Sequence, residues 1–171
     1  MSAAPANSNE VRDMIARQLA SVLRTEVPAA SHLDILDLHR TSTGLSRENW
    51  VFEARWQEQG ESRARRMILR RDPPASLLRT ERRWEFQVLR ALENTPVPAP
   101  AVRWVDSGDT VFGAPAMIMD LLPGLCDWYV LAGERPLAER VQLGRRFIEL
   151  LATIQTEIGR ASCRERVCYA V

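Results

Sequence analysis

The stretch MILRRDPPASLLRTERRWEFQVLRALE, residues 67–93, decides the fold that we expect for this protein. Residues 64–71 predict a strand, which ends at Asp-Pro-Pro, 72–74, because proline cannot extend a hydrogen-bonded ladder. Helical spacing then predicts a helix over 78–93. One stripe of that helix carries Glu85 together with three apolar residues, Val88, Leu89 and Leu92. The helix therefore turns a carboxylate toward the core.

A buried carboxylate without a partner is very costly, so Glu85 should have a cation near it. The best candidates are the arginines of the preceding strand, in MILRR at 67–71. Alternatively, Glu85 reaches solvent at the edge of the stripe, beside Arg82 or Arg83. The spacing leaves both interpretations open.

Three elements are predicted upstream of this stretch. They are an amphipathic helix over 8–23 and two strands over 33–41 and 49–56. A loop, STGLSRE at 42–48, joins the two strands. A polar hairpin turn at 57–63 then leads into the strand at 64–71.

The loop at 42–48 is a candidate phosphate-binding segment. Gly44 permits backbone conformations that other residues resist, and the Ser46 hydroxyl can donate a hydrogen bond to a phosphate oxygen. An ordinary hairpin connection has the same composition, so the loop alone does not distinguish the two.

Two more strands and a helix are predicted downstream. Three prolines at 96–100 predict an extended segment, and strands follow at 101–107 and 114–121. The second of them runs into Pro123-Gly124, as a core strand does where it ends in a turn. A helix with one apolar face is predicted over 136–156, because proline suits a first helical turn.

Three strands, a helix and two further strands are the order of a kinase-type N-terminal lobe. We therefore predict an α+β fold with a five-stranded antiparallel sheet. The predicted divisions are an N-terminal helix at 1–28, a nucleotide-binding lobe at 29–124, a linker with the first helix of a truncated helical C-terminal lobe at 125–156, and a tail at 157–171.

Five motifs occur in order between Leu36 and Thr156. They are GLSRENW at 44–50, LRRDPP at 69–74, EFQVLRAL at 85–92, PVP at 96–98, and Met-Asp to Gly at 119–124. Their order and spacing resemble the aminoglycoside phosphotransferase and choline kinase-like superfamily. Within it, they are most similar to the bacterial phosphotransferase branch that is found fused to or beside acyl-CoA dehydrogenases.

The resemblance implies a phosphate-binding role for the strand and the loop. Arg70 would contact the α- and β-phosphates of ATP, where many relatives use lysine, and Glu85 would orient it. Ser46 and the backbone around Gly44 would cover the phosphates. A planar arginine fork binds phosphate differently from a lysine point charge.

The resemblance also implies the adenine site and the activity. Backbone groups of Asp120 and Leu122 would hold the adenine, with Met119 at the rear of the pocket. The activity implied is ATP-dependent phosphorylation of an alcohol group on a small molecule, with Mg²⁺ accompanying ATP in the complete enzyme. The acceptor molecule and the nucleotide are thus the expected partners.

The residues for the chemical step are missing. The family takes its base and metal ligands from a His-Gly-Asp loop ending in Asn and from a later Asp, whereas His32 and His39 both precede the glycine loop. We therefore predict no catalytic residue and no metal ligand, and an inactive fragment.

The tail has an unusual sequence. IGRASCRERV at 158–167 equals the translation of a common sequencing-library adapter in one reading frame. Residues 157–171 are therefore predicted to be an artefact, with a genuine arginine-rich tail as the alternative.

The composition is that of a globular domain: 171 residues, 46% hydrophobic and 26% charged. The net charge of +1, with arginines interspersed among acids, predicts no nucleic-acid partner. No apolar run predicts a membrane span or signal peptide, so we expect a cytoplasmic protein. All 23 basic residues are arginine, which indicates a GC-rich, bacterial gene. Three scattered cysteines predict neither a disulfide framework nor a metal site.

Two other classes of function are open. One is a non-catalytic nucleotide-binding or interaction module. The other is a structural domain without a nucleotide site, which the motifs at Arg70 and Glu85 disfavour. The coding DNA after Thr156 would separate a truncated enzyme from a module.

Overall fold

The computed structural model describes residues 8–41, 48–72, 82–106, 111–124, 133 and 135–168. The chain forms two compact units. The first comprises residues 1–87 and 100–121, and the second comprises residues 88–99 and 122–171.

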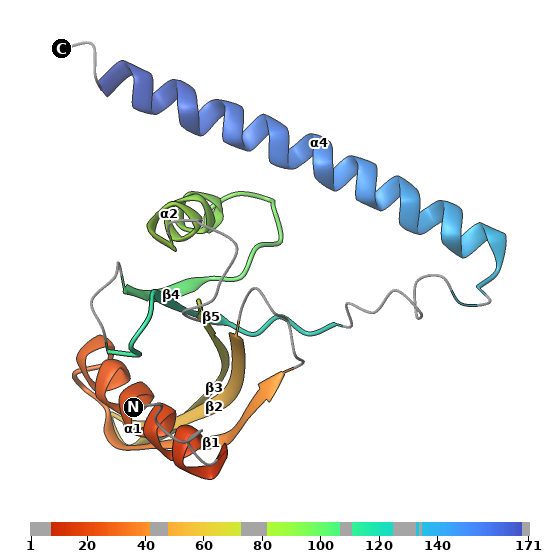
Figure 1. The fold of residues 1–171 in the computed structure, drawn as a ribbon. Coiled ribbons are helices and arrows are strands. Elements are labelled where there is room, and N and C mark those ends of the chain that lie inside the picture. Colours follow the sequence, from red (N-terminus) through yellow and green to blue (C-terminus); the bar gives the residue numbers. More distant parts are fainter. Residues whose placement is uncertain are drawn as a thin grey trace, which may run out of the picture. The chain divides into compact units, whose positions relative to one another are not determined.

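The first unit is built on a five-stranded antiparallel sheet (Figure 1). Its strands are β1 (Ser31–Thr41), β2 (Glu48–Glu58), β3 (Glu61–Arg71), β4 (Val102–Asp106) and β5 (Ala116–Asp120). They lie in the order β1-β2-β3-β5-β4. The predicted α+β class and five-stranded antiparallel sheet are confirmed, and the element order is that of a kinase-type N-terminal lobe.

One face of the sheet packs against α1 (Ser8–Glu26), as Figure 1 shows. Successive residues of a strand point to opposite faces, so alternate apolar side chains reach the helix. The buried core comprises Ile15, Leu19, Val22 and Leu23 of α1 with Trp50, Phe52, Ala54, Trp56, Met67, Leu69, Phe112, Ala116 and Ile118. Burying each large apolar side chain contributes about 1.5–3 kcal/mol, so this face stabilises the sheet.

The helix α2 runs from Arg82 to Leu92, and its first residues belong to the first unit. The sequence predicts this helix over 78–93, and residues 73–81 lie outside the described part of the chain. Segment 96–100, predicted to be extended, contains neither helix nor strand.

The hairpin between β2 and β3 differs from its prediction. The sequence predicts a polar turn over 57–63, but the strands pair as far as Glu58 and Glu61. The turn is only Gln59-Gly60, with φ of 53° and 82°, as in a two-residue type I′ turn. The strand ends were missed because their side chains are polar and show no apolar alternation. The strands pair there all the same, since the ladder is formed by backbone groups.

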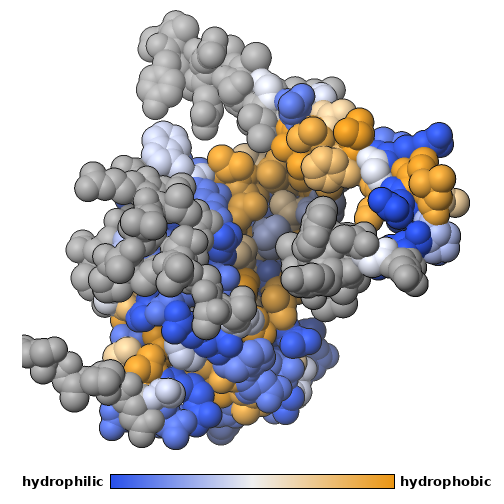
Figure 2. Space-filling model, turned by 45° about the vertical axis from the view of Figure 1, so that its right-hand side comes forward, coloured by the Kyte–Doolittle hydropathy of each residue, from blue (hydrophilic) through white to orange (hydrophobic). Residues whose placement is uncertain are grey.

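The second unit contains α4, Leu137–Cys168, which begins after Pro136 as predicted. The sequence predicts the helix only as far as Thr156, but it continues because no proline interrupts residues 157–168. Among the α4 side chains that the structure describes, six large apolar ones are exposed: Leu137, Val141, Leu143, Phe147, Ile148 and Leu151. Figure 2 shows hydrophobic residues beside hydrophilic ones on one side of the molecule. None of the described helices combines the length and apolar character needed to cross a membrane.

The β2–β3 turn gives a test of backbone strain. Gly60→Ala should destabilise the first unit by about 1 kcal/mol, because a side chain disfavours the left-handed conformation. Urea unfolding followed by tryptophan fluorescence measures this loss. Gly144→Ala is the matched control: an added Cβ meets no atom within 4 Å at either glycine, but Gly144 has no positive φ and lies inside α4. Alanine favours helix, so no loss is expected there. Equal losses in the free energy of unfolding at Gly60 and Gly144 would contradict a left-handed conformation at Gly60.

Candidate functional site

Arg70 and Glu85 meet on the sheet face opposite α1. Met67 and Leu69 belong to the core with α1, so Arg70, the residue after Leu69, points to the other face. The Arg70 Nη1 donates a hydrogen bond to Glu85 Oε1 at 2.5 Å. The two side chains are only 22% and 19% exposed. The predicted contact between strand and helix is present.

A second arginine also holds Glu85. Arg82, one turn earlier on α2, donates from Nη1 to Glu85 Oε2 at 2.6 Å. Its Nη2 donates to Oδ1 of Asp72, the residue just after β3. The Arg82 side chain is 1% exposed. Four charges thus form a chain in the order Arg70, Glu85, Arg82, Asp72, with no net formal charge.

The sequence interpretation treated Arg82 only as a companion of a solvent-exposed Glu85. The structure buries Arg82 instead and pairs it on both sides. The i, i+3 spacing of Arg82 and Glu85 on one helix was the available signal. Asp72 gave no such signal, because its approach to Arg82 depends on where the helix lies over the strand.

Apolar side chains surround Arg70 on the same face. Cross-strand pairing places Met117 opposite Arg70, and it places Val51 and Met119 on either side of Ile68. Val51, Met117 and Met119 are buried. Met119 was predicted as a site residue, whereas Val51 and Ile68 were missed because their shared face depends on strand register. A cation therefore borders an apolar surface.

The Asp120 carboxylate does not lie on the sheet face that carries Arg70. Asp120 pairs with Met67, so its side chain shares the face of the α1 core. Arg103 binds that carboxylate through both Nε, at 2.9 Å, and Nη2. The Asp120 N–H donates to the Ala101 carbonyl at 2.9 Å. The Asp120 N–H is therefore already bonded within the sheet.

Leu122 is the first residue of the second unit, and its side chain is 50% exposed. The preceding residue, Leu121, still continues the sheet, since its N–H donates to the Arg66 carbonyl at 3.0 Å. Gly124 has a φ of 147°, which suits glycine at the predicted Pro-Gly break.

The predicted loop residues Gly44 and Ser46 lie at 42–47, outside the described residues. The base of this loop is described. Arg71 binds Oε2 of Glu48 through Nε at 2.9 Å and Nη2 at 2.6 Å. Its Nη1 donates to the Phe112 carbonyl at 3.0 Å. Arg40, on the other side of the loop, lies 3.3 Å from Glu48 Oε1. Glu48 is thus paired with Arg40 of β1 on one side and with Arg71 of β3 on the other, at the base of the loop.

Residues 37–162 match the sequence model of the phosphotransferase enzyme family. This range is more than half of the chain and contains every predicted site residue. The chain belongs to the phosphotransferase enzyme family. A phosphotransferase needs cations placed where phosphate oxygens bind. Arg70, with its planar guanidinium, is the candidate for that position.

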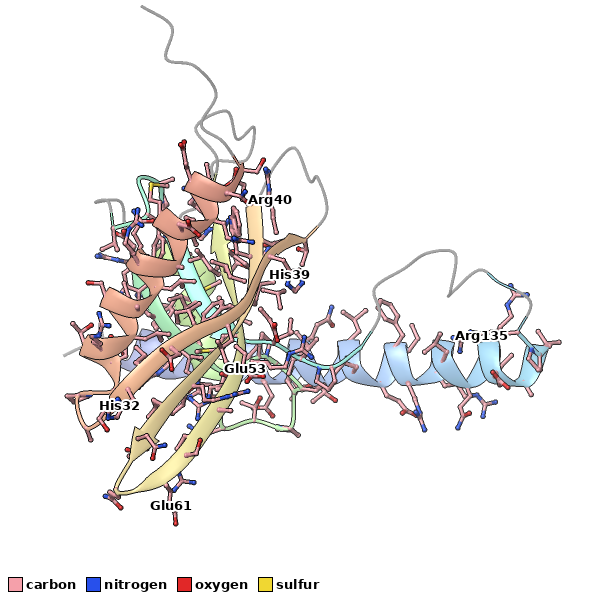
Figure 3. The ribbon with its side chains drawn as sticks, turned by 90° about the horizontal axis from the view of Figure 1, so that it is seen from below. His32, His39, Arg40, Glu53, Glu61 and Arg135 are labelled. Carbon is pink, nitrogen blue, oxygen red and sulfur yellow. The ribbon has the colours of Figure 1, made fainter. Side chains whose placement is uncertain are left out.

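The other groups typical of phosphotransferase chemistry are not gathered in the described part of the chain. His32 and His39 both lie on the edge strand β1, and Glu61 lies at the hairpin tip (Figure 3). Among the described residues, no group of three or more His, Cys, Asp and Glu side chains could hold a metal ion.

The strength of the ion pair between Glu48 and Arg71 at the base of the loop can be measured. In a double-mutant cycle, Glu48→Gln and Arg71→Met should show a coupling free energy of at least about 1.5 kcal/mol, since the pair is largely buried and charge-assisted. Urea unfolding measures the four stabilities. The exposed pair Glu61 and Arg63 is the matched control, and its coupling should be about 0.5 kcal/mol or less. Similar coupling in both pairs would show that burial does not strengthen the loop base.

Proposed function

We propose that this chain carries the nucleotide-binding lobe of an ATP-dependent phosphotransferase that acts on a hydroxyl group of a small molecule. The contact between Arg70 and Glu85 carries this proposal. It holds a guanidinium on the β3 face beside apolar side chains, within a chain of the phosphotransferase enzyme family.

In this proposal, the two parts of ATP bind two kinds of surface. Arg70 binds phosphate oxygens of the nucleotide, and Glu85 keeps its guanidinium in place. Ile68, which is partly exposed, would contact the purine ring, with the buried Met119 behind it at the rear of the pocket. The Asp120 carbonyl and the Leu122 backbone would bind the adenine edge, and the loop with Gly44 and Ser46 would cover the phosphates.

Mg²⁺ that accompanies ATP would neutralise charge on the phosphate oxygens. We assign it no ligand among the residues of this chain. The family resemblance implies that the base and metal ligands come from a His-Gly-Asp loop, and neither His32 nor His39 stands in such a motif. We infer that binding and catalysis are separable here, with binding retained.

Nucleotide binding tests the proposal directly. Arg70→Ala should weaken binding of MgATP by at least about tenfold, because it removes a charge-assisted hydrogen bond to phosphate. Isothermal titration calorimetry measures the affinity. The variant should still fold, since Arg82 continues to pair with Glu85. Arg63→Ala, on the same strand but at its exposed end, is the control and should bind like the wild type. Unchanged affinity in Arg70→Ala would contradict the proposed role of Arg70 in phosphate binding.

Catalysis is tested separately. The purified 171-residue chain, incubated with γ-labelled ATP and a panel of small hydroxyl compounds, should transfer no label, because the catalytic loop is missing from its sequence. Thin-layer chromatography of the products measures the transfer, with a complete small-molecule kinase as the positive control. Labelled product that forms with the wild type and decreases in Arg70→Ala would disprove the inactivity.

A further inference from the structure

Arg82 is the one buried charged residue in the described part of the chain, with a relative exposure of 2%. A guanidinium removed from water is costly unless its charge and N–H groups are paired. Arg82 binds two carboxylates, from Glu85 on its own helix and from Asp72 at the end of β3. Its Nε lacks a hydrogen-bond partner among the described residues. A buried guanidinium with these two bonds fixes the positions of the carboxylates that it binds.

Arg82 constrains Glu85 in a particular way. The two oxygens of this carboxylate contact different arginines: Oε1 accepts from Arg70 at 2.5 Å, and Oε2 accepts from Arg82 at 2.6 Å. Arg82 and Glu85 are neighbours on one helical turn, so their contact is set by the helix itself. The carboxylate plane is therefore fixed from the helix side, and Oε1 is presented to Arg70 on the strand.

Arg82 also neutralises Asp72. Asp72 follows Arg70 by two residues, and its N–H donates to the Pro115 carbonyl at 3.0 Å, which extends the ladder. Alternation along the strand therefore places its carboxylate on the same side as Arg70. Without Arg82, this carboxylate would be an unpaired anion close to Arg70, where it competes for the guanidinium and repels phosphate.

We propose that Arg82 is a positioning residue of the nucleotide site: by binding Glu85 and Asp72 together, it directs the Glu85 carboxylate at Arg70 and cancels the charge of Asp72. This inference rests on the proposed function, in which Arg70 binds phosphate. Arg82 acts through its two acidic partners and does not itself touch the nucleotide.

The experiment measures MgATP affinity by calorimetry in Arg82→Met, Arg82→Lys and the double variant Arg82→Met with Asp72→Asn. Arg82→Met should bind about tenfold more weakly, because loss of a supporting partner lets Glu85 turn and leaves Asp72 charged. Arg82→Lys should also bind more weakly, since a single ammonium cannot replace the fork that bridges two carboxylates. Arg55→Met is the matched control: it removes an exposed arginine paired with Glu53 and should leave affinity unchanged.

The double variant separates positioning from structural support. Adding Asp72→Asn to Arg82→Met removes the uncompensated carboxylate, so binding should recover by several-fold. Tryptophan fluorescence during urea unfolding checks that each variant is folded. If Arg82→Met does not fold, Arg82→Lys and the double variant, which leave fewer unpaired buried charges, decide the question.

The outcomes are distinct. If the wild type binds no MgATP, the proposed function fails, and this inference fails with it. If the wild type binds and Arg70→Ala weakens binding, but folded Arg82 variants bind like the wild type, only the role of Arg82 is overturned. Weaker binding in Arg82→Met with partial recovery in the double variant supports it.

Discussion

The contact between Arg70 and Glu85 connects the two kinds of secondary structure in this lobe. It joins the middle strand of the sheet to the helix that follows it, on the face that the α1 core leaves open. Buried apolar packing can hold α1 to one face without directional bonds, but α2 reaches its strand through charges. The direction of these bonds fixes which atoms of Arg70 and Glu85 face one another.

The two faces of the sheet therefore differ in composition and in role. Toward α1, alternate side chains form a continuous apolar core that stabilises the strands. On the opposite face, Arg70 stands among Ile68, Met117 and Met119, so a charged group borders an apolar surface. One residue of register shift would exchange these faces, because strand alternation has a period of two. The long β2–β3 ladder, closed by a tight turn, holds the register in which Arg70 faces away from the core.

An arginine-only set of cations shapes the ion pairs of this chain. Arg71 binds Glu48 through two nitrogens, Arg103 binds Asp120 through two nitrogens, and Arg82 bridges two carboxylates. Such geometry suits a planar fork, and a lysine ammonium could not reproduce it. The loop base, the edge strand and the α2 junction are each fixed in this way. The contact of Arg70 with Glu85 therefore belongs to a set of arginine–carboxylate pairs that extends through the lobe.

The spacing left Glu85 either paired with an arginine of the preceding strand or in solvent beside Arg82 or Arg83, and the structure decided for the pair with Arg70. The sequence by itself determined the order of helices and strands, the α+β class and the family. These follow from apolar periodicity, from proline breaks and from motif spacing, which are local along the chain. Only the tertiary structure decided the length of the β2–β3 hairpin, the burial of Arg82, its bond to Asp72, and the common face of Val51, Ile68 and Met119. Each of these depends on strand register or on where a helix lies over the sheet, because residues distant in sequence become neighbours only when the backbone ladder and the packing of side chains have brought their elements together.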